Sequence, residues 1–314
     1  MIAIACQHTN RAKRGIRNGQ QRWKCRDCGA MFTCNEERPL GAMRVDMDKA
    51  CVVLNMLLEG MSIRACSRIT GMKAGTICDL IVHVGENCDK FLESAIVNVK
   101  TRAAQLDEIW DFSGCKQKTK ERLGRDDDCG DIWTWLGIDA DTKLILSHAV
   151  GQRDEYTGER FLNRLNNATS GRIQVTTDGL GIYTNGVPFA LGSRCDYAQL
   201  IKSYKSSQEE TRYSPATITG IEIVTRFGSP NMDEVSTSYS ERLNLSVRMH
   251  IRRYTRLTNA HSKSSRHHAA MTALFVAWYN FCRRNEAVRN QTPAMASGLT
   301  EHVWSIKELL QSAK

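Results

Sequence analysis

The chain has 314 residues, more than a usual single domain, so the sequence predicts one body of ordinary size with smaller modules attached. Lysine and arginine number 43 against 34 aspartates and glutamates, a formal net charge of +9 that favours a partner rich in phosphate. Twelve scattered cysteines without a signal peptide, and no apolar run of the roughly 20 residues that span a membrane, argue against a secreted disulfide scaffold or a membrane protein and favour the cytoplasm.

The N-terminal segment has the cysteine pattern of a zinc ribbon. Cys25 and Cys28 can hold one Zn²⁺ between them, and the glycine that follows allows the turn beneath the metal. Cys6 and His8 lie upstream, across a hairpin-like turn at "RNGQQ", and could complete a four-ligand site. Because Cys-x-His is tighter than the common Cys-x-x-Cys, Cys34 is an alternative to His8. A disordered basic leader with incidental cysteines is the alternative for the segment as a whole.

The next segment predicts a helix-turn-helix. A first helix is expected at 46–58, where apolar residues recur at core spacing. Ser62 can cap a short second helix that Gly71 ends, and a third helix resumes at 74–88. The last helix of such an arrangement enters the major groove of DNA, although a plain helical bundle has the same pattern. The residues expected to face DNA are Lys73, Thr76 and Asp79.

After residue 103 the periodicity changes to that of an α/β domain. Strands are predicted at 104–112, 131–142, 144–150 and 172–178, with a helix at 155–166 before the last of them. Three meandering strands, a helix and a fourth strand are the order of a ribonuclease H-like core, a mixed sheet with flanking helices. The predicted domains are a zinc ribbon at 1–40, a helix-turn-helix module at 41–100, a catalytic domain at 101–290 and a C-terminal helical tail at 291–314.

Three carboxylates on different elements are candidates for one catalytic site. Asp107 lies within the first predicted strand, and Asp178 ends the fourth. Glu241 falls in the early turns of a later helix that Ser236 or Ser238 can cap. Three acids suit a centre of two Mg²⁺ ions, which prefer oxygen ligands and act on both the attacking and the leaving oxygen of a phosphodiester.

Each of these acids also has an ordinary structural interpretation. Asp107 could be an exposed strand residue, with Glu108 as the inward one. Asp178 could form a turn, and Glu241 could face solvent on its helix. The three therefore carry weight only together.

Several long phrases of the chain closely resemble transposases of the insertion-sequence-one family. They are, in order, "LDEIWDF", "GDIWTWLGIDADTKLI", "VTTDGLGIY", "DYAQLIKSY", "RYSPATITG", "STSYSERLNLSVRMHIRRYTRLTNAHSK", "WYNFCR" and "TPAMASGLTEHVWSI". The resemblance spans residues 105–306 and extends to the N-terminal ribbon and helix-turn-helix. It implies a DDE transposase of a bacterial or archaeal type cell, acting as a homodimer or higher homo-oligomer on terminal inverted repeats and target DNA. The triad carries over as Asp107, Asp178 and Glu241.

A basic segment follows the third acid. Between Arg242 and His268 stand seven lysines and arginines and no acid, which suits phosphate contacts, although a solvated helix face has the same composition. Asn244 and Arg248 belong to the phrase that contains Glu241 and could steer DNA or support that acid. The candidate DNA-binding residues are Arg22, Lys73, Thr76, Asn244, Arg248, Arg252, Arg253 and Arg256, with Lys263 and Arg266 nearby.

Two other functions fit the same sequence features. A DNA-binding repressor would use the zinc ribbon and the helix-turn-helix without any metal triad. A recombinase with a protein nucleophile, such as Tyr239 or Tyr254, would form a covalent link to DNA.

Overall fold

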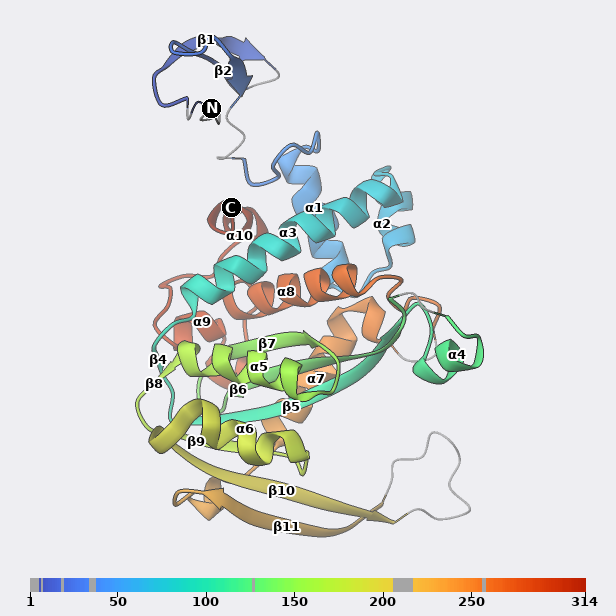
Figure 1. Cartoon of the computed structure of the whole chain (residues 1–314), viewed down its shortest axis with the longest axis vertical. Helices are drawn as coiled ribbons and strands as arrows, with labels where there is room; N and C mark the ends of the chain where they lie inside the picture. Colours follow the sequence, from blue (N-terminus) through green and yellow to red (C-terminus); the bar gives the residue numbers. More distant parts are fainter. Residues whose placement is uncertain are drawn as a thin grey trace, which may run out of the picture.

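The computed structural model describes Cys6 and residues 8–17, 20–33, 38–125, 128–205, 217–255 and 258–314 (Figure 1). Cys34 and Arg256, two of the predicted functional residues, lie outside these ranges. No helix in the described ranges is long and apolar enough to cross a membrane.

A small antiparallel sheet forms the N-terminal part. Its strands are β1 (Arg11–Arg17), β2 (Gln20–Cys25) and β3 (Met31–Thr33), in that order. Arg11 pairs with Cys25 in the β1–β2 hairpin, and the Arg11 guanidinium lies 4.7 Å from the centre of the Trp23 ring. The predicted hairpin at this position is confirmed.

Three helices follow, and all three begin close to their predicted starts. They are α1 (Met47–Leu58), α2 (Ile63–Thr70) and α3 (Ala74–Ala95). Ser62 Oγ accepts a hydrogen bond from the Ala65 N–H at 3.1 Å and caps α2. Gly71 ends α2 in the left-handed conformation, at φ 68°, which glycine adopts without strain. Helix α3 continues past the predicted end at residue 88 to Ala95, because its C-terminal half keeps an apolar face with the buried Cys88 and Leu92.

The body is built on a six-stranded mixed sheet. Its strands are β5 (Ala103–Ser113), β6 (Gly130–Asp139), β7 (Ile145–Gly151), β9 (Ile173–Thr177), β10 (Cys195–Lys205) and β11 (Thr217–Phe227). They lie side by side in the order β11-β10-β9-β5-β6-β7. β5, β6 and β7 form an antiparallel meander, β9 and β10 run parallel to β5, and β11 is antiparallel to β10. This mixed α/β arrangement is compatible with a ribonuclease H-like core.

Helices cover both faces of the sheet. They are α5 (Glu155–Ala168) and α6 (Gly181–Leu191) on one face, and α7 (Ser238–His250) and α8 (Ser265–Phe281) on the other. Two successive residues of β6 show which helices lie on which face, because the side chains of neighbouring strand residues point to opposite faces of the sheet. Trp135 packs on Phe161 of α5 and Tyr183 of α6, whereas the Thr134 hydroxyl lies 2.6 Å from the Tyr254 hydroxyl, beside α8.

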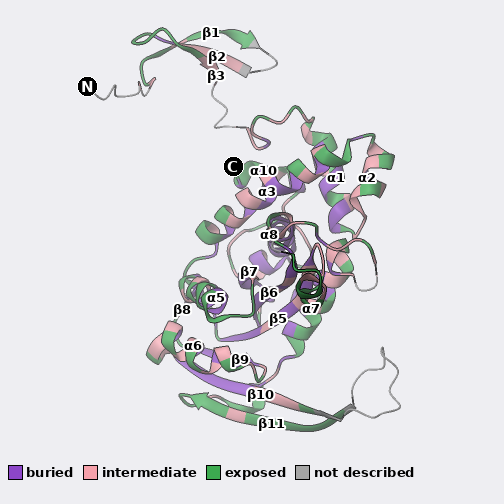
Figure 2. Ribbon diagram, turned by 45° about the vertical axis from the view of Figure 1, so that its right-hand side comes forward, coloured by how far each residue is buried: buried purple, intermediate pink, exposed green. Residues whose placement is uncertain are grey.

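Helix α8 is almost wholly buried because α3 lies along its outer side (Figures 1 and 2). The two helices are closest at Gly85, where a Cβ atom would stand 2.1 Å from the Ala270 carbonyl oxygen. Glycine is therefore required at this crossing. One hydrophobic core runs through the helices α1 to α3 and through the sheet with its covering helices. It includes Leu54 of α1, Leu106 of β5 and Phe281 of α8.

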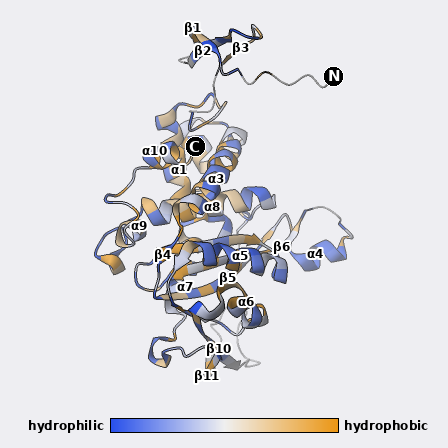
Figure 3. Ribbon diagram, turned by 60° about the vertical axis from the view of Figure 1, so that its left-hand side comes forward, coloured by the Kyte–Doolittle hydropathy of each residue, from blue (hydrophilic) through white to orange (hydrophobic). Residues whose placement is uncertain are grey.

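Short elements complete the chain. They are β4 (Val99–Lys100), β8 (Thr169–Ser170), α4 (Gln117–Arg122), α9 (Pro293–Ala296), α10 (Ile306–Ser312) and the 3-10 helices Gly192–Arg194, Met232–Glu234, Arg252–Tyr254 and Glu286–Val288. Helix α4 is hydrophilic along its length (Figure 3).

Most of the predicted elements of the body are present near the predicted positions. The three meandering strands, the helix after them and the fourth strand are confirmed, although β9 ends at Thr177, one residue before its predicted end at Asp178. The predicted cap of α7 is wrong, because its N-cap is Thr237 and makes no side-chain capping hydrogen bond. Ser236 instead accepts a hydrogen bond from the Ser238 N–H at 3.2 Å, within the approach to the helix.

Candidate metal centres

Asp107 and Asp178 lie level with each other on neighbouring strands. β5 and β9 are parallel, and Gln105 pairs with Thr176, so Asp107 and Asp178 stand two residues further along each chain. Carboxyl oxygens of Asp107, Glu108 and Asp178 all lie within 4.8 Å of one another. Two acids that are far apart in the sequence are thus brought together by strand register.

The two aspartates are oriented by hydrogen bonds from their surroundings. Asp107 Oδ1 accepts from the Glu108 N–H at 2.8 Å, and its Oδ2 accepts from Asn244 Nδ2 of α7 at 2.7 Å. Asp178 Oδ1 accepts from the Leu180 N–H at 2.9 Å. Gln199 of β10 donates to the Asp178 carbonyl oxygen at 2.9 Å. Both strands and helix α7 therefore fix the positions of these carboxylates.

The charge at this site is poorly compensated. Burial, together with the negative charges of Glu108, Asp178 and Glu241, raises the pKa of Asp107 to about 7. The Oδ1 atom of Asn244, next to Asp107, is buried and has no hydrogen-bond partner. Oxygen donors close together with excess negative charge fit a hard divalent cation such as Mg²⁺.

Glu108 belongs to the acid cluster, but the residues that bind its side chain lie on the face of β5 opposite to that of Asp107. Its side chain is 1% exposed and forms an ion pair with Arg153, whose Nε donates to Glu108 Oε1 at 2.9 Å. The Tyr183 hydroxyl donates to Oε2 at 3.2 Å. Burial and the nearby Asp178 charge raise the pKa of Glu108, and Arg153 opposes that rise. Glu108 is thus already paired with an arginine, whereas Asp107 is not.

The third predicted acid lies beside this cluster rather than within it. Glu241 is in the first turn of α7, as expected, but its carboxylate is held by an ion pair with Lys202 of β10 and by the Thr237 hydroxyl at 2.8 Å. Burial acts to raise the pKa of Glu241, but the hydrogen bonds from Lys202 and Thr237 outweigh it, so the pKa is lowered. Lys202 was not identified from the sequence, because nothing in a single strand residue indicates a contact with a helix 39 residues away.

The predicted DNA-binding residues of the basic segment occupy different environments. Arg252 is exposed, and Arg248 is half-buried near Asp111. Burial raises the pKa of Asp111 to about 6, and the positive charge of Arg248 opposes that rise. Arg253 faces inward, where burial lowers its own pKa and Ser262 Oγ lies 3.5 Å from its Nη1. Arg266 is exposed and forms an ion pair with Glu86.

The residues predicted to face DNA in the helical part lie at the start of α3. Lys73 is the N-cap residue of α3 and is exposed, as is Asp79 on that helix. Thr76 is half-buried in the first turn. Arg22 is half-buried on β2 of the small sheet.

The two tyrosines considered as nucleophiles differ in access. Tyr254 is 4% exposed, and its hydroxyl lies 2.6 Å from Thr134 Oγ1 and 2.7 Å from Thr272 Oγ1. Burial also raises its pKa well above the usual value, which makes the hydroxyl a poor nucleophile. Tyr239 is 40% exposed, and Lys143 Nζ lies 3.5 Å from the centre of its ring.

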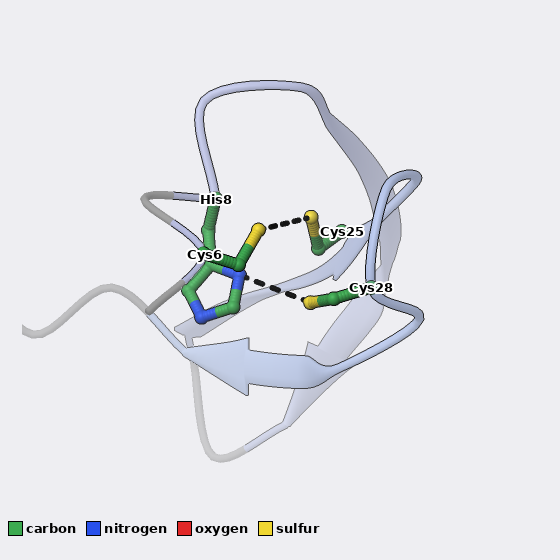
Figure 4. Close-up of side chains that lie close together, drawn as sticks. All are labelled: Cys6, His8, Cys25 and Cys28. Carbon is green, nitrogen blue, oxygen red and sulfur yellow. Dashed lines mark hydrogen bonds between the residues drawn. The ribbon is translucent and has the colours of Figure 1, made fainter. Parts of the chain in front are cut away.

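The four predicted zinc ligands point toward one another in the small sheet (Figure 4). Cys6 Sγ lies 3.7 Å from Cys25 Sγ, and Cys28 Sγ lies 3.3 Å from His8 Nδ1. These separations match a tetrahedral Zn²⁺ site, in which Zn–S bonds of about 2.3 Å place two sulfurs about 3.8 Å apart. The backbone N–H of Cys28 and the His8 side chain lower the pKa of Cys25 to about 6, which favours the thiolate that binds metal.

No protein-family model matches the chain, and no curated protein matches it. Among solved structures, the chain is similar to the piggyBac transposase in its synaptic complex with hairpin DNA, determined by cryo-electron microscopy. The two share 11% sequence identity, the match covers 85% of this chain and 70% of that chain, and the TM-score is 0.39. Likeness at this level carries no functional argument, so function has to be inferred from the residues of the site.

Proposed function

We propose that this protein is a DDE transposase that cleaves and joins DNA at the ends of an insertion sequence. The observation that carries the proposal is the cluster of Asp107, Glu108 and Asp178 oxygens within 4.8 Å, with Glu241 on the adjoining helix. The residues of the proposed catalytic centre are Asp107, Asp178 and Glu241, the acids that the sequence resemblance to insertion-sequence-one transposases also selects. Two bound Mg²⁺ ions would supply Lewis-acid activation of water and stabilisation of the leaving oxygen.

The chain's own groups would prepare this centre and hold DNA against it. Asp107 has to lose its proton before it can accept a cation, and Asn244 keeps its Oδ2 in one orientation. Water would attack phosphorus at the end of the element, the P–O3′ bond would break, and the departing 3′ oxygen would take up a proton. That 3′-hydroxyl would then attack target DNA in the same way, with no covalent protein intermediate. Arg248 and Arg252 are the candidates for phosphate contacts next to the acids.

The N-terminal modules would recognise the terminal inverted repeats. Lys73 and Thr76 stand at the start of α3, where a recognition helix contacts base edges, and the Cys6–His8–Cys25–Cys28 cluster would hold a structural Zn²⁺. Cleaving two ends in concert requires at least a homodimer. A repressor would need only these N-terminal modules, and the cluster of three acids is what favours an enzyme over that alternative.

The test uses end-labelled duplexes that cover the DNA on either side of the coding sequence. With Mg²⁺, the wild-type chain should nick one strand at each end, whereas Asp178→Asn and Glu241→Gln should bind the same duplexes without cleaving them. The exposed acids Asp233 and Glu222 provide matched controls, and Asp233→Asn and Glu222→Gln should cleave normally. Full cleavage by Asp178→Asn would contradict the proposal, and so would a covalent protein–DNA adduct.

A further inference from the structure

Glu241 forms an ion pair with Lys202 and lies outside the group of carboxylates that contains the other two acids. Lys202 Nζ donates to Glu241 Oε1 and lies 3.4 Å from Thr237 Oγ1, which itself donates to the same Glu241 oxygen at 2.8 Å. The group of carboxylates within 4.8 Å of one another contains Asp107, Glu108 and Asp178. Glu241 is nevertheless close to the centre, because it lies three residues before Asn244 on α7, and Asn244 Nδ2 donates to Asp107 Oδ2 at 2.7 Å.

Lys202 is the less exposed partner of this pair. On β10, Gln199 pairs with Thr177, the last residue of β9. Lys202 is three residues beyond Gln199, so it stands just past the end of β9, where Asp178 follows. The Lys202 side chain is 21% exposed and that of Glu241 is 52% exposed. The Glu241 side chain is thus the more accessible of the two.

We propose that Lys202 is a positioning residue that holds Glu241 against Thr237 in the metal-free protein and competes with a divalent cation for this carboxylate. The inference rests on the two-metal function proposed above. A cation that enters the centre has to draw Glu241 away from Lys202, and it also meets the positive charge of the lysine. Both effects weaken metal binding, and the first of them depends on the Glu241 carboxylate.

Titration calorimetry of Mg²⁺ into the full chain without DNA measures this competition directly. Lys202→Met should tighten Mg²⁺ binding about fivefold, which is the size of effect that one partly exposed ion pair produces. Lys202→Arg should restore the wild-type affinity, because it restores the ion pair. Lys90→Met removes the same charge from an exposed site on α3 and should change nothing.

A double-mutant comparison separates the ion pair from a general charge effect. In the Glu241→Gln background, Lys202→Met should tighten Mg²⁺ binding by much less than fivefold, because there is no carboxylate left to release and only the effect of the lysine charge remains. An unchanged or weaker affinity in Lys202→Met would overturn the inference. A full fivefold gain in the Glu241→Gln background would overturn it as well, since the lysine would then act by charge alone.

The same titration distinguishes this inference from the proposed function. If wild-type protein binds Mg²⁺ and Asp178→Asn binds it equally well, the two-metal centre itself is wrong. If Asp178→Asn loses binding while Lys202→Met matches the wild type, only the role of Lys202 is wrong. Circular dichroism and thermal unfolding of each variant establish that it is folded before the titration is interpreted.

Discussion

Asn244 on α7 donates a hydrogen bond to Asp107 on β5, with 2.7 Å between Nδ2 and Oδ2. The contact joins the helix that carries Glu241 to the strand that carries the first acid, so it sets the distance between two members of the proposed triad. The sequence suggested that Asn244 steers DNA or supports Glu241. Its contact with Asp107 indicates a support role within the centre.

Replacing Asn244 with alanine should therefore impair cleavage more than DNA binding. Partners that orient metal ligands typically contribute about 10- to 100-fold to metal affinity or activity, and Asn244→Ala is expected to lose cleavage by a factor in that range. Rates of Mg²⁺-dependent nicking and gel-shift affinities measured on the same duplex provide the comparison. Leu245→Ala, at the neighbouring exposed position of α7, serves as the control. Equal losses of binding and cleavage in Asn244→Ala would instead assign the residue to DNA contact.

The raised pKa of Asp107 predicts a pH dependence of stability in the metal-free protein. The pKa of Asp107 is about 7 in the folded chain, whereas the ordinary value, which applies to the unfolded chain, is 3.8. The folded state therefore binds the proton more tightly than the unfolded state. The stabilising effect of this group is complete below pH 3.8 and is lost as the pH rises through 7. The free energy of unfolding should fall by on the order of 3 kcal/mol over this range. This figure follows from about 1.4 kcal/mol per pKa unit, reduced because Asp107 is partly exposed.

Urea unfolding of the wild type and Asp107→Asn between pH 4 and 8 measures the effect of Asp107 and of the acids coupled to it, because contributions from groups that do not interact with Asp107 cancel in the difference. The stability of the wild type relative to Asp107→Asn should fall with pH without metal. Added Mg²⁺ should reverse the fall, since the bound cation favours the deprotonated carboxylate. A difference that stays constant across this pH range would show that the Asp107 carboxyl titrates normally.

The zinc cluster predicts one Zn²⁺ ion per chain. Cys25→Ser should abolish zinc retention after dialysis, because it removes the buried ligand whose pKa is lowered to about 6. His8→Ala should weaken retention through loss of the fourth ligand. Cys34→Ser tests the alternative ligand from the sequence, and it is expected to keep the metal. Elemental analysis of the four proteins gives the zinc content, and loss of zinc in Cys34→Ser alone would reassign the site.

The close crossing of α3 and α8 predicts opposite effects for two glycines of one helix. A methyl group at Gly85 would stand 2.1 Å from the Ala270 carbonyl oxygen, so Gly85→Ala should destabilise the protein by about 2–3 kcal/mol through overpacking. Gly75, in the first turn of α3, has no atom within 4 Å of such a methyl group. Gly75→Ala should stabilise by about 0.4–1 kcal/mol through reduced freedom of the unfolded chain. Thermal and urea unfolding would measure both, and a neutral Gly85→Ala would mean that the helices can separate there.

Local sequence patterns predicted the elements of the body well. β5, β6, β7 and β9 each have apolar, β-branched or aromatic runs bounded by turn residues, and α2 has its serine cap and terminal glycine. Asp178 was expected at the end of a strand, and it follows Thr177, the last residue of β9. Such features depend on neighbours in the chain, and so one sequence is enough to find them.

Contacts between distant segments could not be predicted in the same way. A basic segment without acids indicates an exposed surface, yet Arg253 turns inward beside a buried hydroxyl network. Glu108 was considered only as a rival to Asp107, whereas the two occupy opposite faces of β5 and meet different partners. The pairing of Lys202 with Glu241 depends on the position of α7 over the end of β10, which no pattern within either element encodes.

In the proposed transposase, the length of α3 would set the spacing between the recognised and the cleaved DNA. The helix is continuous over 22 residues, about 33 Å, and its later turns are locked to α8 at Gly85. A repeat bound at its first turns would be held by a rigid rod fixed to the domain that carries Asp107 and Asp178. The protein would then measure a fixed interval from the recognised bases to the cleaved phosphate, and DNA with a few base pairs inserted between them should be bound but not cut at the element's end.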